Sequence, residues 1–160
     1  MSDEPRVQVH ADRASLATTV AMRFIAKLID LVEEFGEANV VLTGGTMGEA
    51  VLEAVRTAPN VSAVPWGRVN VWWGDERWLP AGDVERNDTL ARRALLDHIP
   101  VDPARVHPMP ASDGGLDLDA AAIAYEAEIA AAAPSHLSLP PFDIVFLGVG
   151  PDGHVASLFP

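Results

Sequence analysis

An apolar run that leads directly into a glycine-rich turn constrains this chain more than any other feature of its sequence. Residues 144–147 are apolar on both faces, a pattern typical of a buried parallel strand. Glycines recur between positions 148 and 153, where they allow the backbone to turn sharply. Functional groups in open α/β sheets gather beyond the carboxyl ends of the strands. The sequence therefore predicts that Asp152 and His154 lie at the rim of a sheet.

The spacing of Gly148, Gly150 and Gly153 also matches the dinucleotide-binding fingerprint. That fingerprint requires a helix at the third glycine and an acidic residue about twenty positions further on. Only seven residues follow Gly153. We therefore expect a different site, in which the glycines present His154 at the sheet edge. A histidine that only caps a loop is the alternative interpretation.

Composition limits the classes of protein to which the chain can belong. Its 160 residues are 49% hydrophobic, which predicts one globular domain over residues 1–160. The longest apolar runs are too short for a membrane span and residues 1–5 are acidic, so we expect a cytoplasmic protein with no membrane partner. Without cysteines or closely spaced histidines, no metal site is expected. A net charge of −12 argues against nucleic acid as a partner.

Strand patterns alternate with helix patterns along the chain. Strands are predicted at 7–9, 40–42, 69–73 and 144–147, a weaker extended piece at 106–109, and helices at 13–35, 47–55, 88–96 and 118–132. The stripe of the first helix is predicted to be core: Leu16, Val20, Phe24, Leu28, Leu31 and Phe35. The tryptophans are interpreted as packing around the sheet: Trp66, Trp72, Trp73 and Trp78. The alternation predicts an α/β fold with an open, mostly parallel, Rossmann-like sheet and helices on both faces.

The loop after the second predicted strand has the composition of a phosphate site. It consists of Thr43, Gly44, Gly45 and Thr46, followed by a helix. The glycines expose backbone N–H groups, the helix adds its positive end, and the threonine hydroxyls are further donors. A Gly-Gly pair that only makes a tight turn is the alternative.

The loop after the third predicted strand carries charged groups that should meet the same rim. Asp75 and Glu76 precede Arg77, which is expected to make a bidentate contact with phosphate oxygens. An internal ion pair is the alternative. Asn87 is expected to reach this rim, although a helix cap explains it equally well. Arg77 and Arg86 are also expected to reverse the negative field locally for a small anion.

In order and spacing, the three loops resemble the 6-phosphogluconolactonase family. The motifs are T-G-G-T at 43–46, G-D-E-R at 74–77 with Asn87 downstream, and G-V-G-P-D-G-H-V-A-S-L-F-P at 148–160. The resemblance covers essentially the whole chain and implies a fold similar to glucosamine-6-phosphate deaminase and ribose-5-phosphate isomerase. Family members continue well past the last motif, so we expect the N-terminal part of such a domain, truncated at its C-terminus. A monomer is expected if the fold is complete.

The resemblance implies hydrolysis of 6-phospho-D-glucono-1,5-lactone to 6-phosphogluconate in the oxidative pentose phosphate pathway, without a cofactor. It makes His154 the base that activates water, with Asp152 or Asp75 orienting the histidine or the water. Backbone N–H groups of the turn at 148–153 are candidate oxyanion donors. Residues expected to bind the phosphorylated lactone are Thr43, Gly44, Gly45, Thr46, Arg77, Asn87, Gly150 and Gly153.

Two alternatives share the implied fold. Glucosamine-6-phosphate deaminases carry a tyrosine after the D-E of the second loop and read close to D-G-H-I-A-F-N-E-P in the third. Arg77 and the S-L-F-P sequence at 157–160 therefore favour a lactonase. A non-catalytic sugar-phosphate-binding module is the other alternative. The sequence has neither a helix-turn-helix pattern nor a basic surface that would support it.

Overall fold

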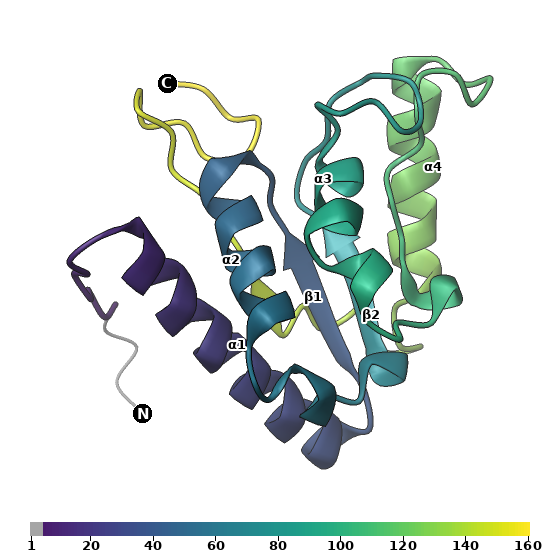
Figure 1. Cartoon of the computed structure of the whole chain (residues 1–160). Coiled ribbons are helices and arrows are strands. Elements are labelled where there is room, and N and C mark those ends of the chain that lie inside the picture. The colour runs from purple at the N-terminus through teal and green to yellow at the C-terminus, as the bar shows by residue number, and fades with distance from the viewer. Residues whose placement is uncertain (1–4) are drawn as a thin grey trace.

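The computed structural model describes residues 5–160 and has a parallel sheet at its centre (Figure 1). Its strands are β1 (Ala38–Leu42), β2 (Val69–Trp73) and β3 (Ile144–Val145), in the order β2-β1-β3. β1 pairs in parallel with both neighbours. The loop after β1 therefore lies between the loops after β2 and β3.

The helices of the described chain follow the predicted pattern closely. Asp12 accepts a hydrogen bond from the N–H of Ser15 at the start of the first helix, and Gly36, with φ 84°, ends it. The second helix begins at Gly45 instead of Met47, which brings its N-terminus directly onto the glycine pair. The helix bounds are α1 (Arg13–Phe35), α2 (Gly45–Thr57), α3 (Asn87–Ala94) and α4 (Leu118–Ala131).

Alternate side chains of the strands face two separate helical layers. One face, which includes Val71 and Trp73, packs into a core with α1, α2 and α3. On the other face, Val41 and Trp72 pack against Tyr125 of α4. Figure 1 shows α1 and α2 on one side of the strands and α4 on the opposite side. The predicted α/β fold with a parallel sheet and helices on both faces is confirmed.

Two strand predictions need correction. Residues 7–9 form no strand, and Val7 and Val9 are 90% and 89% exposed. A short alternating pattern does not form a strand when no neighbouring strand pairs with it. β3 is shorter than predicted and is not buried, since Val145 is 46% and Leu147 63% exposed. Within residues 5–160, β3 is an edge strand that pairs only with β1, so one of its flanks is open.

The apolar stripe of α1 is core only in its middle. Phe24, Leu28 and Leu31 are buried, as predicted. Phe35 is 64% exposed at the end of the helix. Leu16 and Val20 are half-buried and lie beside the loop after β1. Helical periodicity identified the face of the helix but not which part of that face the sheet covers.

Smaller sequence predictions have mixed outcomes. The extended piece near residue 106 is confirmed as a bridge that pairs Val106 with Val71 of β2. Trp66, Trp72 and Trp73 are buried, as predicted, whereas Trp78 is half-buried. In the described part of the chain, no helix has the length and apolar character needed to cross a membrane. Residues 1–4, part of the acidic segment on which the expectation of a cytoplasmic protein was based, lie outside the described residues.

Candidate functional site

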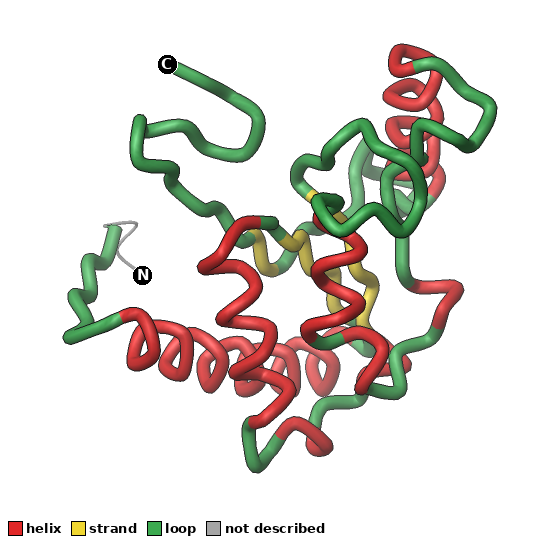
Figure 2. Tube along the Cα trace, turned by 45° about the horizontal axis from the view of Figure 1, so that its top comes forward, coloured by secondary structure: helices red, strands yellow, loops and turns green. Residues whose placement is uncertain are grey.

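The loops that follow β1, β2 and β3 line one cleft with a volume of about 500 Å³. Both views place the C-terminal segment beside the start of α2 (Figures 1 and 2). Asp152 and Gly153 do not line the cleft, although they belong to the loop that closes it. The predicted site residues that the cleft brings together are Thr43, Gly44, Gly45, Thr46, Asp75, Arg77, Asn87, Gly150 and His154.

The loop after β1 presents the N-terminus of α2 to the cleft. Gly44 is the N-cap residue and supplies no side-chain oxygen to the first turn. Gly45 begins the helix with φ 77°, a conformation that favours glycine. The first N–H groups of a helix lack partners within it, and the helix dipole makes this end positive. This end of the cleft therefore suits an anion such as a phosphate.

Close packing explains why position 44 must be glycine. A Cβ atom built on Gly44 would overlap the side-chain amide oxygen of Asn87, which is buried at the start of α3. Asn87 cannot withdraw freely, because its Nδ2 donates to the backbone oxygen of Asp75 at 3.0 Å and to its Oδ1 at 3.3 Å. Asn87 thus connects the loops after β1 and β2 at the wall of the cleft.

Gly44→Ala is expected to lower the free energy of unfolding by about 1–3 kcal/mol, the usual cost of overpacking. Gly67→Ala is the matched control, because a Cβ on Gly67 meets no atom within 4 Å. Urea titrations of the two variants would test this difference. A Gly44→Ala variant as stable as Gly67→Ala would show that Asn87 moves aside without cost.

Glu76 caps α3 instead of facing the cleft. Its carboxylate accepts N–H groups from Arg77 at 2.7 Å, Asn87 at 2.6 Å and Asp88 at 2.9 Å. Burial raises the pKa of Glu76, and the N–H groups oppose this rise. The helix cap that was one interpretation of Asn87 is therefore made by a carboxylate eleven positions earlier in the sequence, to which Asn87 contributes its backbone N–H.

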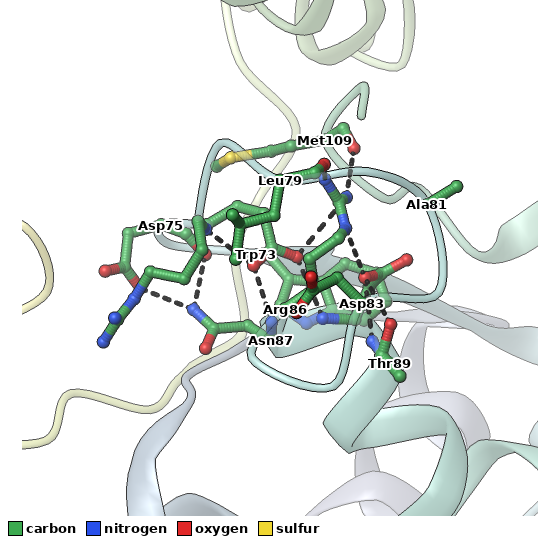
Figure 3. A network of polar contacts seen from close by, with 12 residues as sticks. Trp73, Asp75, Leu79, Ala81, Asp83, Arg86, Asn87, Thr89 and Met109 are labelled. Atoms are coloured by element: carbon green, nitrogen blue, oxygen red, sulfur yellow. Dashed lines mark hydrogen bonds and ion pairs between the residues drawn. The ribbon is translucent and has the colours of Figure 1, made fainter. Parts of the chain in front are cut away.

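Arg86 points into the protein and stabilises the loop between β2 and α3. It is 2% exposed, and its guanidinium donates to Asp88 Oδ1 at 2.9 Å and to the carbonyl oxygens of Leu79 at 3.2 Å and Met109 at 2.8 Å (Figure 3). It also pairs with Glu76 at 3.5 Å. The expectation that Arg86 reverses the field for an anion is wrong, because its charge is neutralised inside the protein.

Arg77 is free to contact a ligand. Its side chain is exposed and lines the cleft, and it forms no ion pair with any residue between 5 and 160. The alternative of an internal ion pair is therefore excluded for Arg77 within the described structure. Asp75 instead contacts Asn87 on one side and the hydroxyl of Ser157 on the other (Figure 3 for Asn87). Arg77 brings a positive charge to the cleft.

Asp152 holds the imidazole of His154. The His154 Nδ1 and backbone N both bond to Asp152 Oδ1, the backbone bond at 3.3 Å. The hydrogen bond from the imidazole lowers the pKa of Asp152. With Nδ1–H donating to a carboxylate, Nε2 carries the lone pair of a neutral imidazole. Asp152 is therefore the carboxylate that is hydrogen-bonded to His154, whereas the side chain of Asp75 bonds to Asn87 and Ser157 in the described chain.

The turn at 150–153 corrects one expectation about oxyanion donors. Gly150 N–H donates to the carbonyl of His154 at 2.8 Å, and Gly153 N–H donates to the carbonyl of Gly150 at 3.0 Å. These two N–H groups close the turn and are not available to a ligand. Gly150 must lack a side chain, because a Cβ there would overlap the His154 ring. Gly153 has φ 90°, so its role is conformational.

The sequence predictions missed two kinds of residue at the site. Leu16 and Val20 of α1 form an apolar wall of the cleft, and their place in a helical stripe concealed this position. Ser157 was noted as part of a motif but given no contact. Its hydroxyl donates to Asp75 Oδ2 at 2.8 Å across 82 positions of sequence. No local signal identifies that pair, because only the fold brings the two loops together.

Comparison with known proteins identifies related sequences and structures. The chain is 52% identical to "6-phosphogluconolactonase" of Streptomyces coelicolor, covering 100% of this chain and 63% of the relative. It is 43% identical to the protein of that name in Mycobacterium leprae, covering 96% and 62%. The solved structure of "6-phosphogluconolactonase from Trypanosoma cruzi" matches with a TM-score of 0.80 and 26% identity, covering 99% of this chain and 64% of that one. The chain thus spans less than two thirds of the length of these relatives.

A family model also matches most of the chain. It is described as glucosamine-6-phosphate isomerases/6-phosphogluconolactonase, and it matches residues 11–160. That range contains all three loops of the cleft, together with α1, which forms its apolar wall. The chain therefore belongs to the glucosamine-6-phosphate isomerase/6-phosphogluconolactonase family.

Proposed function

We propose that this chain carries the catalytic histidine and the phosphate site of a cytoplasmic 6-phosphogluconolactonase. Its reaction is the hydrolysis of 6-phospho-D-glucono-1,5-lactone to 6-phosphogluconate in the oxidative pentose phosphate pathway. One observation carries the proposal: His154, oriented by Asp152, lines the same cleft as the N-terminus of α2. The two bacterial relatives named 6-phosphogluconolactonase support this choice of substrate.

The phosphate of the substrate binds at the start of α2. N–H groups of its first turn and the hydroxyls of Thr43 and Thr46 are the donors, and Arg77 supplies the positive charge from the loop after β2. The apolar wall of Leu16 and Val20 excludes water from one side of the cleft. Binding energy from the phosphate thereby positions the lactone carbonyl near His154.

Hydrolysis then needs a base, because water is a poor nucleophile. Nε2 of neutral His154 accepts a proton from water as the water oxygen forms a bond to the lactone carbonyl carbon. The carbonyl oxygen becomes a tetrahedral oxyanion. When this intermediate collapses, the bond to the ring oxygen breaks and the imidazolium returns its proton to that oxygen. Asp152 stabilises the transient imidazolium through Nδ1, and the transfer of the proton to the ring oxygen regenerates the neutral histidine.

Hydrolysis of freshly generated 6-phosphogluconolactone, measured against its spontaneous rate, tests the proposal. Glucosamine 6-phosphate is the second substrate, because deaminases belong to the same family. We expect acceleration with the lactone and no release of ammonia from the amino sugar. Ammonia release without lactone hydrolysis would identify a deaminase. Binding of 6-phosphogluconate without turnover of either substrate would identify a binding module.

Arg77→Ala is expected to raise KM for the lactone by roughly 10- to 100-fold, the usual loss of a hydrogen bond to a charged group. The effect on kcat should be smaller, because Arg77 contacts the phosphate and not the reacting carbon. Arg68→Ala is the matched control, since Arg68 is also exposed but lies outside the cleft. Steady-state kinetics at low ionic strength measure both variants. An unchanged KM in Arg77→Ala would remove Arg77 from the phosphate site.

A further inference from the structure

The loop that carries His154 has few connections to the rest of the molecule. After residue 148, its backbone hydrogen bonds join residues within the loop, between Gly150 and His154 and between Val155 and Leu158. Val149 and Leu158 are 73% and 78% exposed and Val155 and Ala156 are only half-buried, so apolar packing holds the loop weakly. The segment at 148–160 therefore needs a specific contact if His154 is to keep its position in the cleft.

Ser157 makes that contact. Its Oγ donates to Asp75 Oδ2 at 2.8 Å. Among the residues that the structure describes, no other hydrogen bond joins the segment at 148–160 to the rest of the chain. A single hydroxyl thus connects the loop of the catalytic histidine to the loop after β2.

Asp75 has a fixed position, because Asn87 also forms hydrogen bonds with it. The buried Asn87 donates its side-chain N–H to both the backbone and the carboxylate of Asp75. Asn87 in turn packs against Gly44, at the N-terminus of α2. The contacts Ser157–Asp75–Asn87–Gly44 therefore run continuously from the histidine loop to the phosphate loop.

These contacts also explain how a carboxylate is tolerated in a cleft that binds an anion. Each carboxylate oxygen of Asp75 accepts a hydrogen bond, Oδ1 from Asn87 and Oδ2 from Ser157. Hydrogen-bond donors reduce the electrostatic cost of a negative charge near phosphate. Because both carboxylate oxygens accept these hydrogen bonds, Asp75 fixes the position of Ser157 and does not act as the base, a role that we assign to His154.

We infer that Ser157 is a positioning residue, whose hydrogen bond to Asp75 sets the distance between His154 and the phosphate site. The catalytic consequence of this inference rests on the proposed lactonase activity. The structural consequence does not, because the order of the loop at 148–158 is measurable without a substrate. Displacement of a catalytic group by about 1 Å is enough to lower a rate by about 100-fold.

The test compares Ser157→Ala with Ser157→Thr, which keeps the hydroxyl. Ser62→Ala is the matched control, because Ser62 is exposed and lies outside the cleft. Amide hydrogen exchange measures the order of the loop directly, and the imidazole NMR signals report the environment of His154. For Ser157→Ala we expect exchange at 149–158 to rise at least about tenfold and the imidazole signals to move. Ser157→Thr and Ser62→Ala should match the parent chain.

Kinetics provide the second readout. We expect Ser157→Ala to lower kcat by roughly 10- to 100-fold with little change in KM, and Ser157→Thr to restore the rate. Loop exchange and imidazole signals that stay unchanged in Ser157→Ala would overturn the inference, whatever the activity. A loop that loosens in a chain without lactonase activity would support the positioning role and reject the proposed function. Failure of the positioning role and failure of the proposed lactonase function are therefore distinguishable.

Discussion

Replacing His154 by alanine is expected to lower kcat for lactone hydrolysis by roughly 10²- to 10⁴-fold, the range typical of a lost general base. The imidazole lines the cleft, and its Nδ1 is held by Asp152, which leaves Nε2 for the water. KM should change much less, because the proposed phosphate site lies at the start of α2, apart from the imidazole. Stopped-flow measurement of freshly generated lactone, corrected for spontaneous hydrolysis, measures the loss.

The matched control is His136→Ala, since His136 is exposed and lies outside the cleft. Binding of 6-phosphogluconate, measured by calorimetry, should survive in His154→Ala. Retention of more than about a tenth of the rate in His154→Ala would assign the base role to another group.

Replacing Arg86 by alanine is expected to lower the free energy of unfolding by about 3–5 kcal/mol, the usual cost of removing one member of a buried charge cluster. Glu76 and Asp88 would lose their cationic partner, and the carbonyls of Leu79 and Met109 would lose a donor. Because Glu76 is buried and caps α3, it cannot turn to water without uncapping the helix. Guanidinium titration measures the change.

Arg93→Ala is the matched control for Arg86→Ala. Arg93 lies on α3, which Arg86 directly precedes, and it pairs with Glu49; its side chain is 57% exposed, so its loss should cost at most about 1 kcal/mol. Equal effects of the two substitutions would show that the buried cluster contributes no more than a surface pair. Arg86→Met, which keeps the apolar stem, separates lost packing from lost charge.

The destabilisation by Arg86→Ala should also depend on pH. Burial already raises the pKa of Glu76 above its ordinary value of 4.5, and removal of Arg86 raises it further. A raised folded-state pKa favours folding below the unfolded value, and this contribution is lost as pH rises through the folded value. The penalty is therefore expected to be larger at neutral pH than at pH 4. A penalty independent of pH would show that Glu76 does not respond to Arg86.

Much of the fold was predictable because it depends on local patterns. The helical spacing predicted α1 to its observed ends, and the short apolar segments predicted β1 and β2. The glycine motifs after the strands indicated which loops meet at one rim, since parallel strands end on the same side. The predicted positions of Gly44, Arg77 and His154 around one cleft follow from that topology.

Burial and polar pairing could not be read from the sequence. The apolar residues 144–147 suggested a buried strand, but burial depends on which neighbours cover a strand, and β3 lies at the edge of the described sheet. Arg86 and Arg77 are chemically equivalent in the sequence. One is buried against Glu76 and Asp88 and the other is exposed to the cleft.

By itself, the sequence determined the order of helices and strands, the parallel sheet and the loops that carry the chemistry. These features depend on periodicity and on backbone preferences within a few residues. Only the tertiary structure decided that Glu76 caps α3 and that Ser157 bonds to Asp75. The last pair joins residues 82 positions apart, because hydrogen bonds depend on distance in space and not along the chain.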